Sequence, residues 1–331
     1  MQIPEYWAEA RATGKVNGRE RVVRRFGWSD ESHALAQRQA EERAQAALAE
    51  LQAGRRVPPR EQKLPYGGDG LPIREQVLAR RDDLVITRNS YGAHCLNEPD
   101  VLFADVDVAP RPPDLLERAL SRGAGVLSVT GFLMAIWLLR HEGAGACFLA
   151  VVAALALPVG ILSVRSRLRA RPGPLADNRR RTEQHVRAVL AAHTKGRFAV
   201  YETPAGFRVL ALHQTFDPRG EPARQLLREL RSDPAYVQMC ELQACFRARV
   251  SGKPWRMGVR QIVPRPGVWP VHPDRMASRE QWIGEYEAAA VNFAACRFVE
   301  ESGDGPVHPR CAAMQRIHDE LSRARSGLPL A

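Results

Sequence analysis

Two aspartates that alternate along one apolar stretch are the first residues in the sequence that suggest chemistry. Residues 101–108 (VLFADVDV) have the composition of a strand, in which successive side chains point to opposite faces. Asp105 and Asp107 would therefore lie side by side. Two adjacent carboxylates repel each other unless a cation or strong donors lie between them, and Mg²⁺ or Mn²⁺ prefers such oxygens. We predict that Asp105 and Asp107 are catalytic metal ligands. The alternative is a solvent-facing strand that carries two acids.

A second strand adds a histidine and an arginine. Residues 206–213 (GFRVLALH) form the second half of a predicted hairpin, which we expect to lie close to the strand that carries the aspartates. His213 shares a face with Val209 and Ala211 by strand alternation. We predict His213 as a catalytic residue and Arg208 as a nucleotide contact. The alternative for His213 is a histidine whose hydrogen bonds are satisfied within the core.

A cationic stretch follows at 246–256 (FRARVSGKPWR). Lys253 and Arg256 are predicted to contact a triphosphate or a nucleic-acid backbone, with Trp255 as a stacking surface for a base. The alternative is a solvated strand face followed by a tryptophan that covers the core.

These motifs together resemble the catalytic core of the archaeo-eukaryotic primase superfamily. The resemblance rests on Leu-Phe-Ala-Asp-Val-Asp at 102–107 and on Ala-Leu-His at 211–213, and it extends over about 84–250. It implies an RRM-like fold in which the two aspartates hold divalent metals and the histidine contacts the incoming nucleotide.

The same resemblance implies a third acidic residue on a later strand. Glu300, within Arg-Phe-Val-Glu at 297–300, is the best candidate in this chain, and Asp217 is the second. We therefore add Glu300 to the predicted catalytic residues.

The order of the predicted elements is that of a ferredoxin-like unit. Strands are expected at 101–108, 197–203, 206–213 and 243–250, and helices at 114–122, 179–193 and 221–232. If 114–122 and 179–193 are counted as the two ends of one interrupted helix, this order is β-α-β-β-α-β. We therefore predict an α+β fold with a ferredoxin/RRM-like cytoplasmic domain. A helix at 73–81 and a strand at 84–88 are expected before it.

Two uncharged runs interrupt this unit. Residues 123–139 and 143–164 would form helices about 26 and 33 Å long, against a hydrocarbon core of about 30 Å. We predict an inserted transmembrane helical hairpin, the alternative being a buried hairpin in a soluble core.

The charge of the chain follows this division. Ten basic and two acidic residues between 165 and 197 account for most of the net charge of +11. By the positive-inside rule, both flanks of the hairpin are cytoplasmic. We expect a bacterial-type inner-membrane protein with two spans and with cytoplasmic N- and C-termini, in contact with the lipid bilayer.

The domain organisation follows from these segments. Residues 5–28 surround the turn signal Val-Asn-Gly at 16–18 and precede an Ala-rich helix. Their arginines are interpreted as a solvated basic face, with DNA binding as the alternative. The predicted parts are an N-terminal β-hairpin and helix module at 1–55, a linker at 56–72, an α+β domain at 73–122 and 165–270, the membrane hairpin at 123–164 and a helical extension at 271–331.

Two functions are compatible with these observations. The first is a metal-dependent nucleotide or nucleic-acid binding site that carries out nucleotidyl transfer, with Mg²⁺ or Mn²⁺ as cofactor. The second is a non-enzymatic membrane-anchored scaffold whose basic surface docks on anionic lipids or acidic partners. P-loop, dinucleotide-binding, zincin and serine-hydrolase motifs are absent from the sequence, so the chemistry of those classes has no support.

Overall fold

The computed structural model describes residues 1–61, 71–108, 173–265, 267 and 269–331. The chain divides into two units, of which the first comprises Met1–Asp107 and Glu183–Ala331 and the second Val108–Thr182. The site lies in the first unit. In the second unit, only residue 108 and residues 173–182 are described, and the latter are the first half of a helix.

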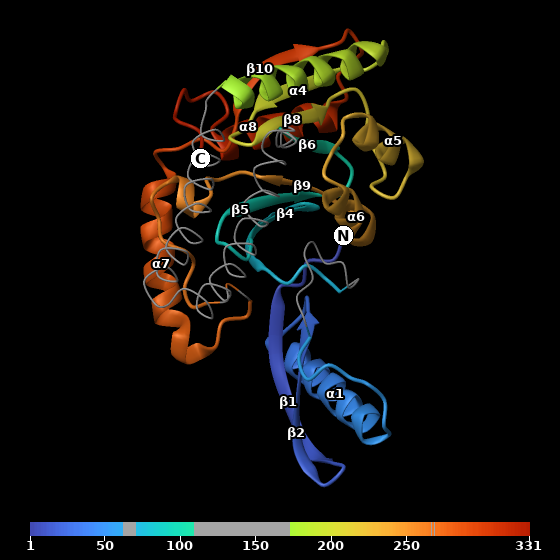
Figure 1. The fold of residues 1–331 in the computed structure, drawn as a ribbon, viewed down its shortest axis with the longest axis vertical. Coiled ribbons are helices and arrows are strands. Elements are labelled where there is room, and N and C mark those ends of the chain that lie inside the picture. Colours follow the sequence, from blue (N-terminus) through green and yellow to red (C-terminus); the bar gives the residue numbers. More distant parts are fainter. Residues whose placement is uncertain (62–70, 109–172, 266, 268) are drawn as a thin grey trace, which may run out of the picture. The chain divides into compact units, whose positions relative to one another are not determined.

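The N-terminal module is a hairpin with one helix. Strands β1 (Tyr6–Val16) and β2 (Arg19–Ser29) pair antiparallel along their whole length, and α1 (His33–Gln52) follows. Figure 1 shows α1 lying along this hairpin. The turn residues Asn17 and Gly18 have φ values of 50° and 75°, the backbone that an Asn-Gly hairpin turn requires. The hairpin and helix expected here are therefore confirmed.

The remaining strands form two antiparallel sheets of four strands each. One has the order β10-β7-β8-β6 and the other β3-β4-β5-β9. The first sheet contains β6 (Phe103–Asp107), β7 (Phe198–Glu202), β8 (Gly206–Ala211) and β10 (Arg297–Ser302). The second contains β3 (Gln76–Arg81), β4 (Leu84–Arg88), β5 (His94–Glu98) and β9 (Phe246–Arg249).

The described helices surround these sheets. They are α4 (Gly173–Ala192), α5 (Glu221–Glu229), α6 (Pro234–Gln243), α7 (Met276–Ala290) and α8 (Pro309–Ser322). In the first sheet, α8 packs on one face, where His318 contacts the rings of Phe103 and Tyr201. On the other face, His193 of the loop after α4 contacts Phe198.

The α+β class is correct, but the single RRM-like sheet is wrong. β7, β8 and β6 are neighbours, as the β-α-β-β-α-β order requires, whereas β9 joins the second sheet by pairing with β5. The reason that β9 joins the second sheet lies earlier in the chain. The segment expected as a helix at 73–81 contains strand β3, which turns into β4 through Asp82 with a φ of 52°. The β4–β5 hairpin that follows offers a free edge, and β9 occupies it.

The predicted membrane topology is also corrected. Within the described ranges, no helix is long and apolar enough to cross a bilayer. Helix α4 shows why, since its 20 residues include the run Arg179, Arg180 and Arg181. On this finding the assignment to the inner membrane, with two spans and cytoplasmic termini, is not retained. The segments 114–122, 123–139 and 143–164 themselves lie outside the described residues.

Candidate functional site

Five of the seven site residues predicted from the sequence line one cavity. Asp105 and Asp107 come from β6, Arg208 comes from β8, and Lys253 and Arg256 follow β9. The cavity has a volume of about 540 Å³. This is within the range of about 300–1,000 Å³ that is usual for small-molecule sites.

Arg208 and Asp105 form the best-defined pair in the cavity. The two residues lie directly opposite each other in the register of β6 and β8. Asp105 Oδ1 accepts a hydrogen bond from Arg208 Nε at 2.7 Å, and Asp105 Oδ2 accepts one from Nη2 at 3.1 Å. The Arg208 side chain is 2% exposed, whereas that of Asp105 is 40% exposed. The carboxylate therefore neutralises a buried guanidinium and keeps one side toward the cavity.

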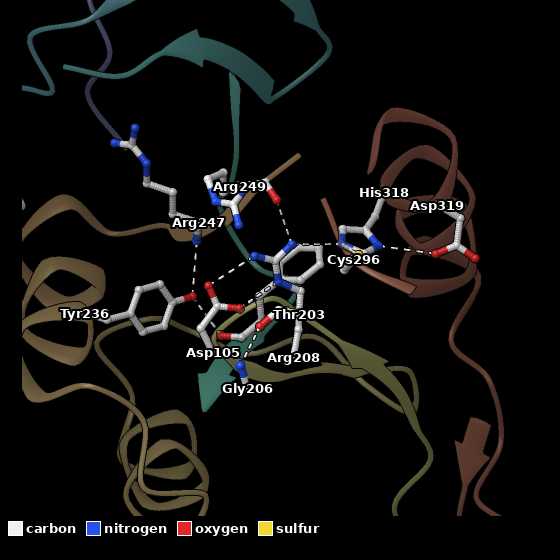
Figure 2. A network of polar contacts seen from close by, with 11 residues as sticks. Asp105, Thr203, Gly206, Arg208, Tyr236, Arg247, Arg249, Cys296, His318 and Asp319 are labelled. Atoms are coloured by element: carbon white, nitrogen blue, oxygen red, sulfur yellow. Dashed lines mark hydrogen bonds and ion pairs between the residues drawn. The ribbon is translucent and has the colours of Figure 1, made fainter. Parts of the chain in front are cut away.

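Behind this pair, Arg208 is held by a second set of contacts (Figure 2). Its Nη1 donates to the backbone oxygen of Arg249 at 2.9 Å and to His318 Nε2 at 3.2 Å. Nδ1 of His318 lies 3.3 Å from Asp319 Oδ1. Because Arg208 can only donate, His318 Nε2 must accept, and the proton of the imidazole is then on Nδ1, facing Asp319. These contacts fix Arg208 in one orientation.

The same network includes Cys296, whose sulfur lies 3.7 Å from His318 Nε2. A cysteine, a histidine and an aspartate in this order are the groups of a nucleophilic triad. Both Cys296 and His318 are completely buried, however. No substrate reaches the sulfur in this conformation, so these residues support Arg208 rather than form a site.

Three further cations of the cavity form no ion pair with an Asp or Glu side chain of the described residues. Arg249, Lys253 and Arg256 all line it, and no Asp or Glu among the described residues lies within 4.0 Å of their charged nitrogens. Arg249 donates to the backbone oxygens of Ser251 and Ala331. Nη1 of Arg256 is buried without a hydrogen-bond partner in the described part of the chain. A buried, unpaired guanidinium nitrogen is costly, so this arrangement favours an anionic ligand.

The position of the loop that carries Lys253 and Arg256 follows from its sequence. Gly252 precedes the short 3₁₀ helix Pro254–Arg256, whose turn is closed by a hydrogen bond from Arg256 N to Lys253 O at 2.9 Å. A Cβ atom at Gly252 would lie 2.3 Å from the sulfur of Met257. The absence of a side chain therefore allows the loop to pack closely and to bring both cations to one cavity wall.

The charges of the cavity influence one another. Burial raises the pKa of Asp107, and the neighbouring Asp105 carboxylate raises it further. Burial lowers the pKa of Lys253, and the nearby Arg249 and Arg256 lower it further. Groups with perturbed pKa values in one cavity are typical of functional sites. Here burial is the largest cause of both shifts, and the guanidinium groups beside Lys253 add to the lowering of its pKa.

An aromatic surface lies next to these cations. Trp255 is 55% exposed, and its ring makes an edge contact with Tyr91 at 5.4 Å between centroids. Lys253 Nζ lies 5.5 Å from the Trp255 centroid and 5.9 Å from that of Tyr91. A second hollow of about 420 Å³ is lined by both rings, and Tyr91 also lines the first cavity. An exposed indole beside a cationic cavity is suited to stack on a planar ligand.

Two predicted residues, His213 and Glu300, lie elsewhere. In the register, Phe207 and Val209 pair with Val106 and Ala104, so the odd-numbered residues of β8 share the face opposite Asp105. His213 continues this odd-numbered series, and its ring contacts Phe198, a residue of that opposite face. Burial lowers the pKa of His213.

Glu300 is on β10, the edge strand farthest from β6, where it forms an ion pair with Arg187 at 3.1 Å. Asp217, the second candidate for a third acid, follows β8 and caps a turn by accepting from the backbone N of Arg219 at 2.9 Å. Neither residue is among those that line the cavity.

The hydrogen-bond donors around Asp105 occupy the carboxylate oxygens that the predicted divalent metal would need. Both oxygens of Asp105 accept from Arg208, so a guanidinium takes the place of the cation expected beside the two aspartates. Among the residues that the structure describes, no group of three or more His, Cys, Asp and Glu side chains could hold a metal ion. Of the two aspartates, only Asp107 is left without an ion pair in the described chain. The Mg²⁺ or Mn²⁺ site stays a prediction that the geometry does not support.

Sequence reasoning missed Tyr91. It lies in a loop organised by Asn89, whose Oδ1 accepts hydrogen bonds from the backbone N of Tyr91, Gly92 and Ala93 at 3.2, 3.0 and 3.1 Å. The segment Asn-Ser-Tyr-Gly at 89–92 has the composition of such a loop, in which an Asn side chain replaces a backbone acceptor. That composition predicts the turn but not its proximity to Trp255, which comes from a segment more than 160 positions later.

Comparison with known proteins found no protein-family model, no curated protein and no solved structure that matches this chain. The resemblance to the archaeo-eukaryotic primase superfamily therefore stays a prediction.

Proposed function

We propose that the cavity binds a nucleotide and holds its phosphates with Arg249, Lys253 and Arg256. The observation that carries this proposal is the convergence of these three cations on one cavity, with no Asp or Glu side chain of the described residues within 4.0 Å of their charged nitrogens. Like charges brought together in a partly buried site repel one another, which agrees with the lowered pKa of Lys253. A phosphate group relieves this repulsion and accepts the charge-assisted hydrogen bonds that the cations offer.

A nucleotide accounts for the aromatic surface as well as for the cations. Trp255 and Tyr91 lie within 6 Å of Lys253 Nζ, so a ligand with phosphates on Lys253 has its base within reach of the indole ring. Stacking of a base on an aromatic side chain contributes about 1–3 kcal/mol and tolerates different bases. Inorganic phosphate alone would leave this surface unused.

Binding, rather than nucleotidyl transfer, is the activity that the contacts favour. Two-metal transfer needs carboxylate oxygens that are free to coordinate metal, and those of Asp105 are engaged by Arg208. Asp105 instead orients Arg208 at the cavity wall, and the carboxylate of Asp107 lies close enough to Lys253 to influence its pKa. The proposed interaction is therefore direct contact between cations and phosphates, and it does not depend on a divalent metal.

Isothermal titration of the full chain with ATP in the presence of EDTA tests this proposal. The Lys253→Ala/Arg256→Ala double variant should bind ATP at least about tenfold more weakly than the unaltered chain, since it loses two charge-assisted contacts. Arg260→Ala is the matched control, because Arg260 is close in sequence but exposed and paired with Glu285 at 3.1 Å. It should bind ATP as the unaltered chain does.

Two results would contradict the proposal. One is an unaltered chain that binds no ATP in the presence of EDTA. The other is a double variant whose affinity equals that of the Arg260→Ala control.

A further inference from the structure

The N-terminal hairpin presents one packed and one open face. Ala10 and Ala12 of β1 are buried together with Ala36, Ala40 and Ala44 of α1. At Gly14, a Cβ atom would lie 2.9 Å from a Leu48 methyl group. The even-numbered residues of β1 therefore face α1, and the odd-numbered residues face away from it.

The distal half of the open face is exposed and rich in cations. The register places Arg11 opposite Arg24, Thr13 opposite Val22 and Lys15 opposite Glu20. We define the ribbon face as these residues: Arg11, Thr13, Lys15, Glu20, Val22 and Arg24. Thr13 and Lys15 are exposed, the Arg11 side chain is 56% exposed, and Val22 is 45% exposed. Thr13 and Val22 are β-branched residues paired across the two strands and exposed between cations, so they do not belong to the core of the module.

Charge is segregated within this module. Residues 6–29 contain six Arg or Lys and two Glu, whereas residues 33–52 contain two Arg and three Glu. On the ribbon face, Arg11 and Arg24 share one acid, Glu9, at 3.5 and 3.3 Å. Lys15 and the tip residues Arg19 and Arg21 have no ion pair with any described residue. The positive charge is therefore concentrated on the hairpin and not on its helix.

We propose that the ribbon face docks in the major groove of duplex DNA. A two-stranded antiparallel ribbon has strands about 4.8 Å apart, and the major groove of B-form DNA, about 12 Å wide, admits such a ribbon with its side chains. The six-residue distal segments of β1 and β2 extend about 20 Å, roughly half a turn of the groove. Arg11, Lys15 and Arg24, the cations of the ribbon face, then contact phosphates. Thr13 and Val22 lie toward base edges, where their methyl groups suit thymine.

The same geometry separates DNA from RNA. The major groove of A-form RNA is too narrow and deep for side chains to enter. The ribbon face therefore distinguishes a B-form duplex from an A-form duplex of the same sequence, which phosphate attraction alone does not do. This site is independent of the nucleotide cavity, because all its residues belong to β1, β2 and the turn between them.

Fluorescence anisotropy with the full chain tests the proposal. Labelled probes of one sequence would be a 20-base-pair DNA duplex, the RNA duplex and the single DNA strand. We expect the DNA duplex to bind at least about tenfold more tightly than the other two. Arg11→Ala/Lys15→Ala should weaken duplex binding about tenfold and reduce the slope of log affinity against log salt by about two. Arg55→Ala/Arg56→Ala removes the same charge from exposed positions outside the ribbon face. This control should retain the affinity of the unaltered chain.

Three outcomes would overturn the proposal. They are equal losses in the two double variants, equal affinity for the DNA and RNA duplexes, and no binding of the DNA duplex at low salt. The thermal unfolding midpoint of each variant shows that the module is intact, because all four substituted side chains are exposed. Thr13→Asp is a further variant. It keeps the positive charges and places a carboxylate at the predicted base edge, so it should also abolish the preference for duplex DNA.

Discussion

Arg208 and Asp105 face each other across β8 and β6 and are joined by hydrogen bonds of 2.7 and 3.1 Å. The guanidinium is buried and continues on its other side to His318 and to the backbone of Arg249. One pair thus connects the carboxylate that lines the cavity with helix α8 and with the strand that carries further cations. This connection explains why an aspartate predicted as a metal ligand has a structural partner instead.

Removing the carboxylate of this pair should destabilise the fold. Asp105→Asn leaves Arg208 buried without a counter-charge, and because Asp105 is partly exposed we expect a loss of about 2 kcal/mol in the free energy of unfolding. Urea denaturation measures it. In Asp105→Asn/Arg208→Met both charges are gone, so the double variant should lose less than the sum of the two single variants. Additive losses would show that the two side chains do not depend on each other.

The Tyr236 hydroxyl should contribute to stability by linking the two sheets. It donates to the backbone oxygen of Phe103 in β6 at 2.7 Å and accepts from the backbone N of Arg247 in β9 at 3.3 Å. Tyr236→Phe removes both hydrogen bonds from a buried position, and we expect a cost of about 1.5 kcal/mol in urea denaturation. Tyr6→Phe, at an exposed tyrosine, is the control and should be neutral. A neutral Tyr236→Phe would disprove this role.

Glu98 should make the stability depend on pH near neutrality. Burial, with a contribution from Asp100, raises the pKa of Glu98 to about 7 from the ordinary value of 4.5. Between these two pH values the folded chain binds more protons at Glu98 than the unfolded chain, so this group makes the free energy of unfolding fall as pH rises. Above pH 7 the full penalty of the buried charge is present.

Glu98→Gln should remove this dependence. The amide oxygen can still accept from Arg310, which contacts Glu98 Oε1 at 2.7 Å in the unaltered chain. We expect the variant to gain stability relative to the unaltered chain at pH 8 and to lose that advantage at pH 5, as thermal unfolding at the two pH values would show. Glu280→Gln, an exposed position on α7, should have the same effect at both. An advantage of Glu98→Gln that is largest at pH 5 would refute the expected fall in stability with rising pH.

Trp255→Ala should distinguish the contribution of the base from that of the phosphates to the affinity for a nucleotide. Because 55% of Trp255 is exposed, its removal should leave the fold intact. Loss of one stacking contact should weaken ATP binding about tenfold, whereas the affinity for inorganic tripolyphosphate should not change. Competition titrations with both ligands give this comparison. Equal losses for ATP and tripolyphosphate would mean that Trp255 does not contact the base.

Local structure could be predicted from the sequence where one segment carried its own signal. The Asn-Gly turn at 17–18, the strand around Asp105 and the 206–211 strand are present as expected. The helix expected at 73–81 is wrong, since this segment contains strand β3, which pairs with β4 through a turn at Asp82, where φ is positive. Because the second sheet contains this extra hairpin, β9 pairs with β5 there instead of joining the predicted sheet. A choice between two sheet edges far apart in the chain is not encoded in periodicity.

The candidate site shows the same limit. Strand alternation correctly predicted that Asp105 and Asp107 lie on one face of their strand. It did not predict which residues of β8 lie on the same side of the sheet. In the observed register, Asp105 shares a face with Arg208 and the other even-numbered residues of β8. A shift of one residue would place it on the face of the odd-numbered series, to which His213 belongs. Lys253 and Arg256 could be identified from the sequence because they lie in a segment rich in cations. Their convergence with Tyr91 depends on long-range packing.

Photo-crosslinking of the full chain with 8-azido-ATP, followed by mass spectrometry of the peptides, is the most direct test of nucleotide binding in the cavity. We expect adducts on the peptides that contain Tyr91 or Trp255. Excess ATP should suppress these adducts, and Lys253→Ala/Arg256→Ala should abolish them. Specific adducts confined to other segments, or adducts that persist in the double variant, would contradict nucleotide binding in this cavity.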